Sequence, residues 1–231
     1  MAVLLQILSL AAIVLAPGWL HAEESRAFFL TALEQGKRQR IVVYGTSLTA
    51  SAAWPGDLQT TLRASYGSKA KVINAACGGM DSRWGMANLS NRVLRQRPDV
   101  VFLEFTINDA LAESRLTVAE SMANLTSMLT QIRQESPDCD LVVMIMNPPT
   151  GEAWKKRPNI NAYAAGYRRV AKKLSCRLID FSPIWNDLIK HHPDRWNTYA
   201  PDGLHPNKLA CREVILPRLL EKVGHPAPAR R

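Results

Sequence analysis

One serine stands where a strand ends and where a reactive hydroxyl could be presented. Ser47 follows a glycine and a run of β-branched and aromatic residues, 41–44. This pattern predicts a buried strand whose carboxyl end turns sharply at the edge of a sheet. Open α/β folds place their chemistry at this edge. The alternative is that Ser47 only caps the helix that follows, as serines often do.

A histidine and an aspartate late in the chain could activate this serine. His205 is a candidate general base, because an unperturbed imidazole titrates at about pH 6.5. Asp202 lies in the same loop, so its carboxylate can reach the other ring nitrogen and fix the tautomer. Together the three side chains predict acyl transfer through a serine nucleophile. Singly, Asp-Gly is common in turns, and a histidine before a helix is usually exposed and without a function.

Hydrogen-bond donors for the tetrahedral intermediate are available at the same strand ends. Such an intermediate carries a negative oxygen that needs donors aimed at it in advance. We expect the backbone N–H groups of Ser47 and Gly79 and the side-chain amide of Asn108 to form this oxyanion hole. Glycine at position 79 would let the substrate approach the backbone closely. Asn108 followed by Asp109 is also ordinary turn chemistry.

These residues can meet only if a sheet brings the ends of separate strands to one edge. Apolar segments alternate with segments whose apolar residues recur at helical spacing. The predicted strands are 40–44, 71–75, 99–105, 141–146 and 176–181, and the predicted helices are 25–35, 54–65, 87–96, 117–135, 161–175, 183–189 and 207–223. This alternation implies a parallel sheet covered on both faces. We predict an α/β fold, a three-layer αβα sandwich with a five-stranded parallel sheet of the flavodoxin type.

Length and composition suit one globular domain, which we place at 23–224, followed by a tail at 225–231 that we expect to fray. Of the 231 residues, 47% are apolar and 21% are charged, which is ordinary for a globular protein. The net charge of +9 would attract polyanions such as acidic polysaccharide. Because the basic residues are scattered and no recognition motif accompanies them, we expect no nucleic-acid partner.

The first 22 residues contain no Lys, Arg, Asp or Glu, and residues 3–16 are nearly all apolar. This stretch is typical of a secretory signal peptide with a cleavage site after Ala22. The alternative is an uncleaved anchor, because the apolar run approaches the roughly 20 residues that a membrane span needs. The early break at 17–18 favours cleavage. We therefore expect a secreted or periplasmic protein that meets a membrane only if this segment is retained.

The four cysteines, Cys77, Cys139, Cys176 and Cys211, have no metal-binding spacing and are too few for a disulfide scaffold. Two of them, Cys139 and Cys176, stand at the start of predicted strands. They could be bridged in an oxidising compartment if those strands are neighbours. Four free thiols are an equally good interpretation.

The combination of motifs resembles the SGNH (GDSL-type) hydrolase family over most of the chain. The segments that carry the resemblance are Tyr-Gly-Thr-Ser-Leu at 44–48, the glycine block at 74–79, Thr-Ile-Asn-Asp at 106–109 and Asp-Gly-Leu-His-Pro at 202–206. The resemblance implies ester hydrolysis through an acyl-enzyme, with no metal and no cofactor. It implies Ser47 as nucleophile, His205 as base and Asp202 as its orienting carboxylate, with Gly79 and Asn108 in the oxyanion hole.

Two residues depart from the pattern of that family. Thr46 stands where the name-giving motif has aspartate, so no acid flanks the serine in the sequence. Thr106 stands where glycine is usual, which narrows the space beside the oxyanion hole. Neither change removes a catalytic atom, so both bear on substrate fit more than on activity.

The substrate is predicted from what surrounds the strand ends. Apart from the proline-rich loop 147–160, the connections are short, which favours a shallow site and a small acyl group such as acetate. Trp54, Trp84 and Trp196 could stack on sugar rings, and Arg83 could meet an acidic group. For each of the tryptophans, packing in the fold is the simpler interpretation.

We therefore expect an exported serine esterase that removes acyl groups, most readily acetyl, from carbohydrate. A lysophospholipase or thioesterase acting on longer acyl chains is the alternative among enzymes. A carbohydrate-binding protein on a catalytically dead hydrolase fold is the alternative from another class. The three intact residues Ser47, Asp202 and His205 argue against that last alternative.

Overall fold

The five strands form one parallel sheet. The computed structural model describes residues 26–225 of the chain. The strands are β1 (Gln39–Gly45), β2 (Ala70–Asn74), β3 (Val100–Glu104), β4 (Asp140–Ile145) and β5 (Arg177–Asp180). Their order across the sheet is β2-β1-β3-β4-β5, and every neighbouring pair is parallel. The predicted fold class is confirmed, and each predicted strand is present.

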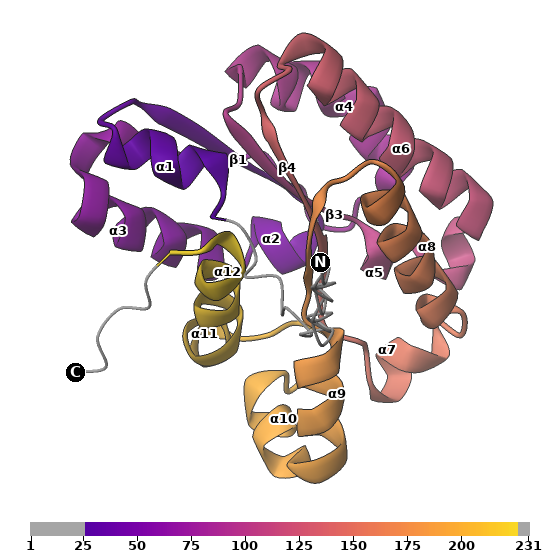
Figure 1. Ribbon diagram of the computed structural model, residues 1–231. Helices are drawn as coiled ribbons and strands as arrows, with labels where there is room; N and C mark the ends of the chain where they lie inside the picture. The colour runs from indigo at the N-terminus through magenta and orange to yellow at the C-terminus, as the bar shows by residue number, and fades with distance from the viewer. Residues whose placement is uncertain (1–25, 226–231) are drawn as a thin grey trace, which may run out of the picture.

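Helices cover both faces of the sheet, as Figure 1 shows. The first face carries α1 (Phe28–Glu34), α3 (Trp54–Tyr66), α9 (Ser182–His191), α10 (Pro193–Tyr199) and α12 (Leu216–Val223), and the second carries α4 (Ser82–Arg92), α6 (Val118–Glu135) and α8 (Ile160–Lys173). Alternate residues of β1 enter the two cores: Ile41 and Val43 pack on the first face, Val42 and Tyr44 on the second. The central strands of the sheet are therefore buried on both sides, and their middle residues are apolar.

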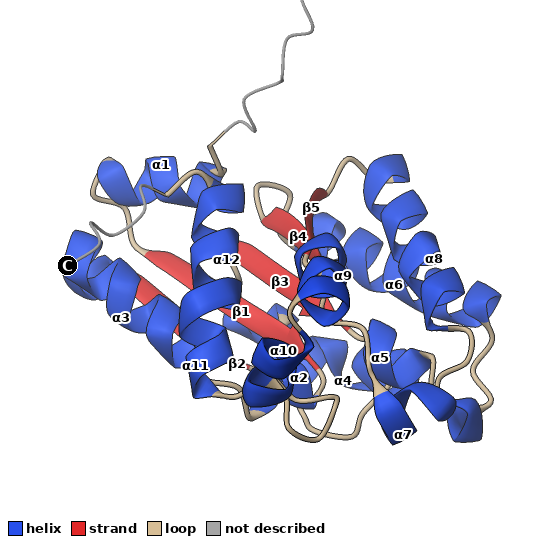
Figure 2. Ribbon diagram, turned by 90° about the horizontal axis from the view of Figure 1, so that it is seen from below, coloured by secondary structure: helices blue, strands red, loops and turns tan. Residues whose placement is uncertain are grey.

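Short helices gather at the edge where the strands end, as Figure 2 shows for α2 (Ser47–Ala50), α5 (Thr106–Asp109), α7 (Gly151–Lys155) and α10. A further short helix, α11 (Lys208–Ala210), precedes α12, and 3-10 turns occupy Gly67–Lys69, Leu94–Gln96 and Ala112–Ser114. Of these short elements, only Leu94–Gln96 and α11 fall within predicted helices, 87–96 and 207–223. The others were not predicted, because so short a helix carries no periodic apolar pattern.

Two of the long predicted helices have different bounds in the structure. Helix α4 begins earlier than expected, because Asp81 caps it by accepting hydrogen bonds from the amides of Arg83 and Trp84. The last predicted helix, 207–223, is interrupted by a π-helical turn at Cys211–Ile215. Pro217 follows this turn and has no N–H to continue the α-helical hydrogen bonds, which accounts for the interruption.

The predictions for the ends of the chain have separate outcomes. Residue 225 was assigned to a fraying tail, and this is wrong: the His225 amide donates to the carbonyl of Leu220 (2.9 Å), and its ring packs edge-on against Tyr66. The predicted signal segment, 1–22, and the rest of the tail lie outside the described residues. Within residues 26–225, no helix is long and apolar enough to span a membrane. The four cysteines are free thiols, so the alternative of a bridge between Cys139 and Cys176 is not realised.

Candidate active site

The nucleophile candidate lies at the junction of β1 and α2. Strand β1 ends at Gly45, which lies against Glu104 of the neighbouring strand β3. A Cβ atom at position 45 would stand 2.4 Å from the Glu104 carbonyl oxygen, so only glycine fits there. Thr46 caps α2, since its Oγ1 accepts a hydrogen bond from the amide of Leu48 (3.2 Å). The alternative that Ser47 is the cap is therefore wrong, and the Ser47 hydroxyl is left for other contacts.

The structure brings Ser47, His205 and Asp202 into one hydrogen-bonded line. The Ser47 Oγ lies 2.9 Å from His205 Nε2, and His205 Nδ1 lies 2.6 Å from Asp202 Oδ2. The other carboxylate oxygen of Asp202 accepts from the amides of Leu204 (2.9 Å) and His205 (2.8 Å). Partial burial opposes the charge of Asp202, but these hydrogen bonds outweigh it and hold its pKa below the usual value. An ionised Asp202 is the group that can stabilise an imidazolium on His205.

The loop that carries Asp202 and His205 is clamped by the loop after β4. Gly203 has φ +70°, and a Cβ atom there would meet the carbonyl oxygen of Thr150 at 2.8 Å. The Thr150 amide donates to the Gly203 carbonyl (2.8 Å), and Asn147 Nδ2 donates to the carbonyl of Leu204 (2.8 Å). Sequence reasoning missed both clamping residues. A signal was present, because Asn147 closely follows a predicted strand end, as Asn108 does.

The predicted oxyanion-hole residues are brought to the same edge. Cys77 donates its amide to the Gly45 carbonyl (3.0 Å), which ties the glycine block to the end of β1. A Cβ atom at Gly78 would contact the Ser47 side chain at 3.7 Å, so this backbone runs beside Ser47. Gly79 has φ +77° and open space around it. Asn108 Nδ2 donates one hydrogen to the carbonyl of Met80 (3.0 Å), which leaves its second hydrogen for a substrate.

A buried aspartate fixes the segment that carries Asn108. Asp109 Oδ1 accepts from the amide of Ser82 (2.7 Å), and Oδ2 accepts from the hydroxyls of Ser121 (2.5 Å) and Tyr167 (3.1 Å). These donors come from α4, α6 and α8, so Asp109 locks α5 to the second face. Burial raises the pKa of Asp109 despite the hydrogen bonds. The sequence interpretation as turn chemistry did not foresee this tertiary role.

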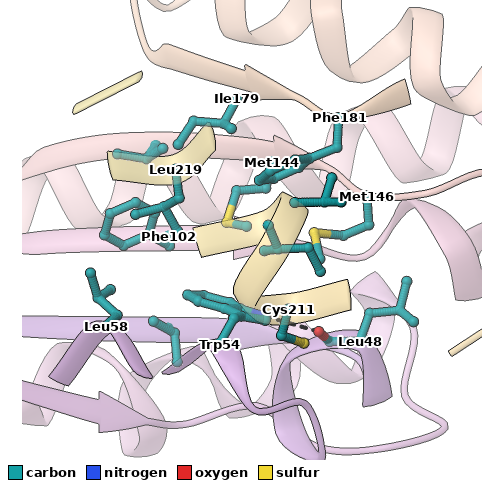
Figure 3. Close-up of a cluster of buried hydrophobic side chains, with 14 of the residues drawn as sticks. Leu48, Trp54, Leu58, Phe102, Met144, Met146, Ile179, Phe181, Cys211 and Leu219 are labelled. Atoms are coloured by element: carbon teal, nitrogen blue, oxygen red, sulfur yellow. Dashed lines mark hydrogen bonds between the residues drawn. The ribbon is translucent and has the colours of Figure 1, made fainter. Parts of the chain in front are cut away.

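Two of the tryptophans considered for sugar binding belong to the core. Trp54 is fully buried, and Figure 3 shows it among Leu58, Phe102 and Cys211, with Nε1 donating to the Leu48 carbonyl (3.0 Å). Trp196 is 2% exposed and donates from Nε1 to Thr150 Oγ1 (3.0 Å). The interpretation of both as packing residues is confirmed, and their candidate role in substrate binding is wrong, because a buried indole offers no face to a sugar ring.

The two other candidate substrate contacts remain predictions. The half-buried ring of Trp84 packs against Tyr44 (5.7 Å between centroids) and lies under the guanidinium of Arg92 (4.9 Å). Arg83 is exposed, but it pairs with Asp81 (3.0 Å) and donates to the Ser114 carbonyl (2.5 Å). Both side chains are thus held by their own neighbours. Among the described residues, no group of three or more His, Cys, Asp or Glu side chains could hold a metal ion.

Comparison with known proteins supplies an independent line of evidence. The model of the GDSL-like Lipase/Acylhydrolase family matches residues 42–212. The chain is 29% identical over 196 residues to Esterase TesA from Pseudomonas aeruginosa, covering 82% of this chain and 88% of the relative. It is 26% identical over 193 residues to an isoamyl acetate-hydrolyzing esterase 1 homolog from Rattus norvegicus, covering 74% of this chain and 76% of the relative.

Solved structures with the same fold include two bacterial proteins. One is Axe2, an acetylxylan esterase from Geobacillus stearothermophilus, with a TM-score of 0.69 at 19% identity over 84% of this chain and 99% of that one. The other is a lipase/acylhydrolase from Enterococcus faecalis, with a TM-score of 0.64 at 24% identity over 79% of this chain and 95% of that one.

Proposed function

Because the chain belongs to the GDSL-like Lipase/Acylhydrolase family of ester hydrolases, we propose that it is an exported serine esterase which removes small acyl groups, above all acetyl, from carbohydrate. The observation that carries the catalytic part is the continuous line from Ser47 Oγ through His205 to Asp202, with contacts of 2.9 and 2.6 Å. No element of this line depends on a cofactor.

The proposed reaction has two halves. His205 takes the proton of the Ser47 hydroxyl as the oxygen attacks the ester carbonyl, and Asp202 stabilises the imidazolium that forms. The amides of Ser47 and Gly79 and the side chain of Asn108 bind the negative oxygen of the intermediate. His205 then gives its proton to the leaving alcohol, and an acyl-serine remains. In the second half, His205 activates water, which attacks the acyl-serine and releases the acid.

The substrate part of the proposal has three supports. The acetylxylan esterase with the same fold and the relatives named for isoamyl acetate both point to acetyl esters. The basic surface, with a net charge of +9, suits an acidic polysaccharide. Apart from the segment between β4 and α8, the connections that follow the first three strands are short and leave little chain to cover a long acyl group.

A fluorophosphonate probe tests the nucleophile. The wild-type protein should form an adduct at Ser47 that mass spectrometry locates, and Ser51→Ala, the same change one turn later, should label equally. A protein that hydrolyses esters but carries no adduct at Ser47 would overturn the assignment. A protein with neither activity nor adduct would support the carbohydrate-binding alternative.

A panel of esters tests the substrate. We expect turnover of p-nitrophenyl acetate to exceed that of the decanoate, and acetate to be released from acetylated xylan. A preference for the decanoate would replace this proposal with a lysophospholipase or thioesterase.

Export is tested on the protein recovered from its native host. We expect the mature protein to begin at Glu23 and to be found outside the cytoplasm. A chain that retains residues 1–22 in the membrane fraction would instead indicate an anchor.

A further inference from the structure

A buried glutamate lies directly beneath the turn that presents Ser47. Glu104 is the last residue of β3, beside Gly45 in the parallel ladder, and is 2% exposed. Its Oε1 accepts hydrogen bonds from the Thr46 amide (2.7 Å), the Thr46 hydroxyl (3.0 Å) and the Thr49 hydroxyl (2.8 Å). The acid that the sequence lacks beside the serine is thus supplied from the neighbouring strand.

These contacts decide which amide of the turn remains open. The Thr46 hydroxyl gives its hydrogen to Glu104, so its lone pair is available for the amide of Leu48 (3.2 Å). The amides before and after Ser47 are therefore both occupied. The Ser47 amide stands in the first turn of α2, where no intrahelical acceptor exists. It is the donor of this turn that is left for an oxyanion.

The same contacts favour the charged form of Glu104, while its surroundings oppose that form. All three donors are neutral, so the carboxylate is buried without a cation among its hydrogen-bond partners. Burial is the main reason why its pKa rises to about 7, and Asp109 of α5 adds repulsion. On α8, Tyr167 feels the charge of Glu104, and Arg168 is committed to Asp180 (2.7 Å).

A cavity with both polar and apolar residues in its wall borders Glu104. The cavity has a volume of about 260 Å³ and lies between the ends of β3 and β4 and helices α8 and α9, with Glu104, Thr106, Asn147 and Arg168 in its wall. Within the described part of the chain, Thr106 Oγ1 and Asn147 Oδ1 are buried and have no hydrogen-bond partner. A cavity of this size has room for several water molecules, and these two polar atoms could bind them. Protons can therefore reach the buried carboxylate.

We propose that Glu104 is a positioning residue for ester hydrolysis, whose carboxylate holds the Thr46–Leu48 turn so that the Ser47 amide stays directed at the oxyanion. The ionised carboxylate of Glu104 performs this role, and because it is buried without a cation among its hydrogen-bond partners, its charge destabilises the fold. The proposal rests on the proposed role of Ser47.

The isosteric variant Glu104→Gln tests the role, with Glu135→Gln, the same change at the exposed end of α6, as control. We expect kcat on p-nitrophenyl acetate to fall about tenfold with KM unchanged and with a melting temperature at pH 8 that is no lower than that of the wild type. An unchanged kcat, or a loss that comes with a lower melting temperature at pH 8, would overturn the proposal.

The pH profile separates positioning from a merely structural role. In the wild type, protonation of Glu104 should contribute to the loss of activity as the pH falls, whereas in Glu104→Gln this contribution is absent and the fall should be less steep. Thr49→Val removes one donor that stabilises the charged form, so its acid limb should move to higher pH. Acid limbs that are identical in the three proteins would overturn the proposal. Fluorophosphonate labelling of the wild type would still show whether Ser47 is the nucleophile.

Discussion

The site has two halves, the turn that carries Ser47 and the loop that carries Asp202 and His205, and they are held in different ways. The Ser47 turn rests on the interior: Thr46 is fully buried, and Glu104 beneath it is 2% exposed. The side chains of Asp202 and His205, by contrast, are 54% and 44% exposed, and main-chain contacts with the loop after β4 hold them. The proposed nucleophile is thus fixed by the sheet and the proposed base by a surface loop. Substitutions beneath Ser47 should therefore change activity by altering buried hydrogen bonds. Substitutions beside His205 should change it by altering the geometry of the loop.

Removal of the Ser47 or the His205 side chain should lower activity most, since these two side chains form the contact between the two halves. Ser47→Ala and His205→Ala should each lower kcat by on the order of 10⁴-fold or more, because the nucleophile or its base is lost. Steady-state hydrolysis of p-nitrophenyl acetate measures this loss. Ser51→Ala should retain wild-type rates, and residual activity near that level in Ser47→Ala would assign the reaction to another residue.

Removal of the Asn108 amide should have the next largest effect, because it affects only the oxyanion. Asn108→Ala should lower kcat by on the order of 10²-fold, the usual loss for one oxyanion-hole donor. The exposed Asn91 at the end of α4 provides the control, and Asn91→Ala should leave kcat unchanged. If Asn108→Ala has the kcat of the wild type, Asn108 does not belong to the oxyanion hole.

Distortion of the surface loop should have a smaller effect on the base. In Gly203→Ala, the new Cβ would stand 2.8 Å from the Thr150 carbonyl oxygen at φ +70°, so the loop must shift. We expect kcat to fall by on the order of 10-fold or more, because His205 moves away from Ser47. Gly56→Ala in α3, where nothing lies within 4 Å of the new atom, is the matched control. Equal rates in the two variants would mean that the loop does not position His205.

The sequence allowed the prediction of which residues come together at one edge of the sheet, but not of the residues that support them. The structure brings together the predicted site residues Ser47, Gly79, Asn108 and His205, because strand ends and loops of a parallel sheet converge on one edge. Glu104 was missed because it closes an apolar strand, and only the pairing of β3 with β1 places it under Thr46. Tertiary pairing of this kind leaves no local pattern.

The sequence could not decide between packing and sugar binding for the tryptophans, for a similar reason. Whether the indole of Trp54 or Trp196 faces solvent depends on how helices from distant segments cover it. Trp54 packs against Cys211 of the last helical segment, about which its own neighbourhood in the sequence gives no information. The strands, in contrast, were predicted well because their apolar character is local.

The pH dependence of protein stability should show the smallest effect of the difference between the two halves. The pKa of Glu104 rises from 4.5 to about 7 on folding, so its contribution to stability is fully present below about pH 4.5 and is lost as the pH rises through 7. This loss amounts to about 3 kcal/mol at most, at 1.36 kcal/mol per pKa unit. Glutamine does not titrate, so the melting temperature of Glu104→Gln should fall less between pH 5 and pH 8 than that of the wild type, by several degrees. If the melting temperatures of the two proteins change equally between pH 5 and pH 8, burial does not destabilise the charged form of Glu104. The buried half of the site would then not differ in energy from the exposed half that contains Asp202.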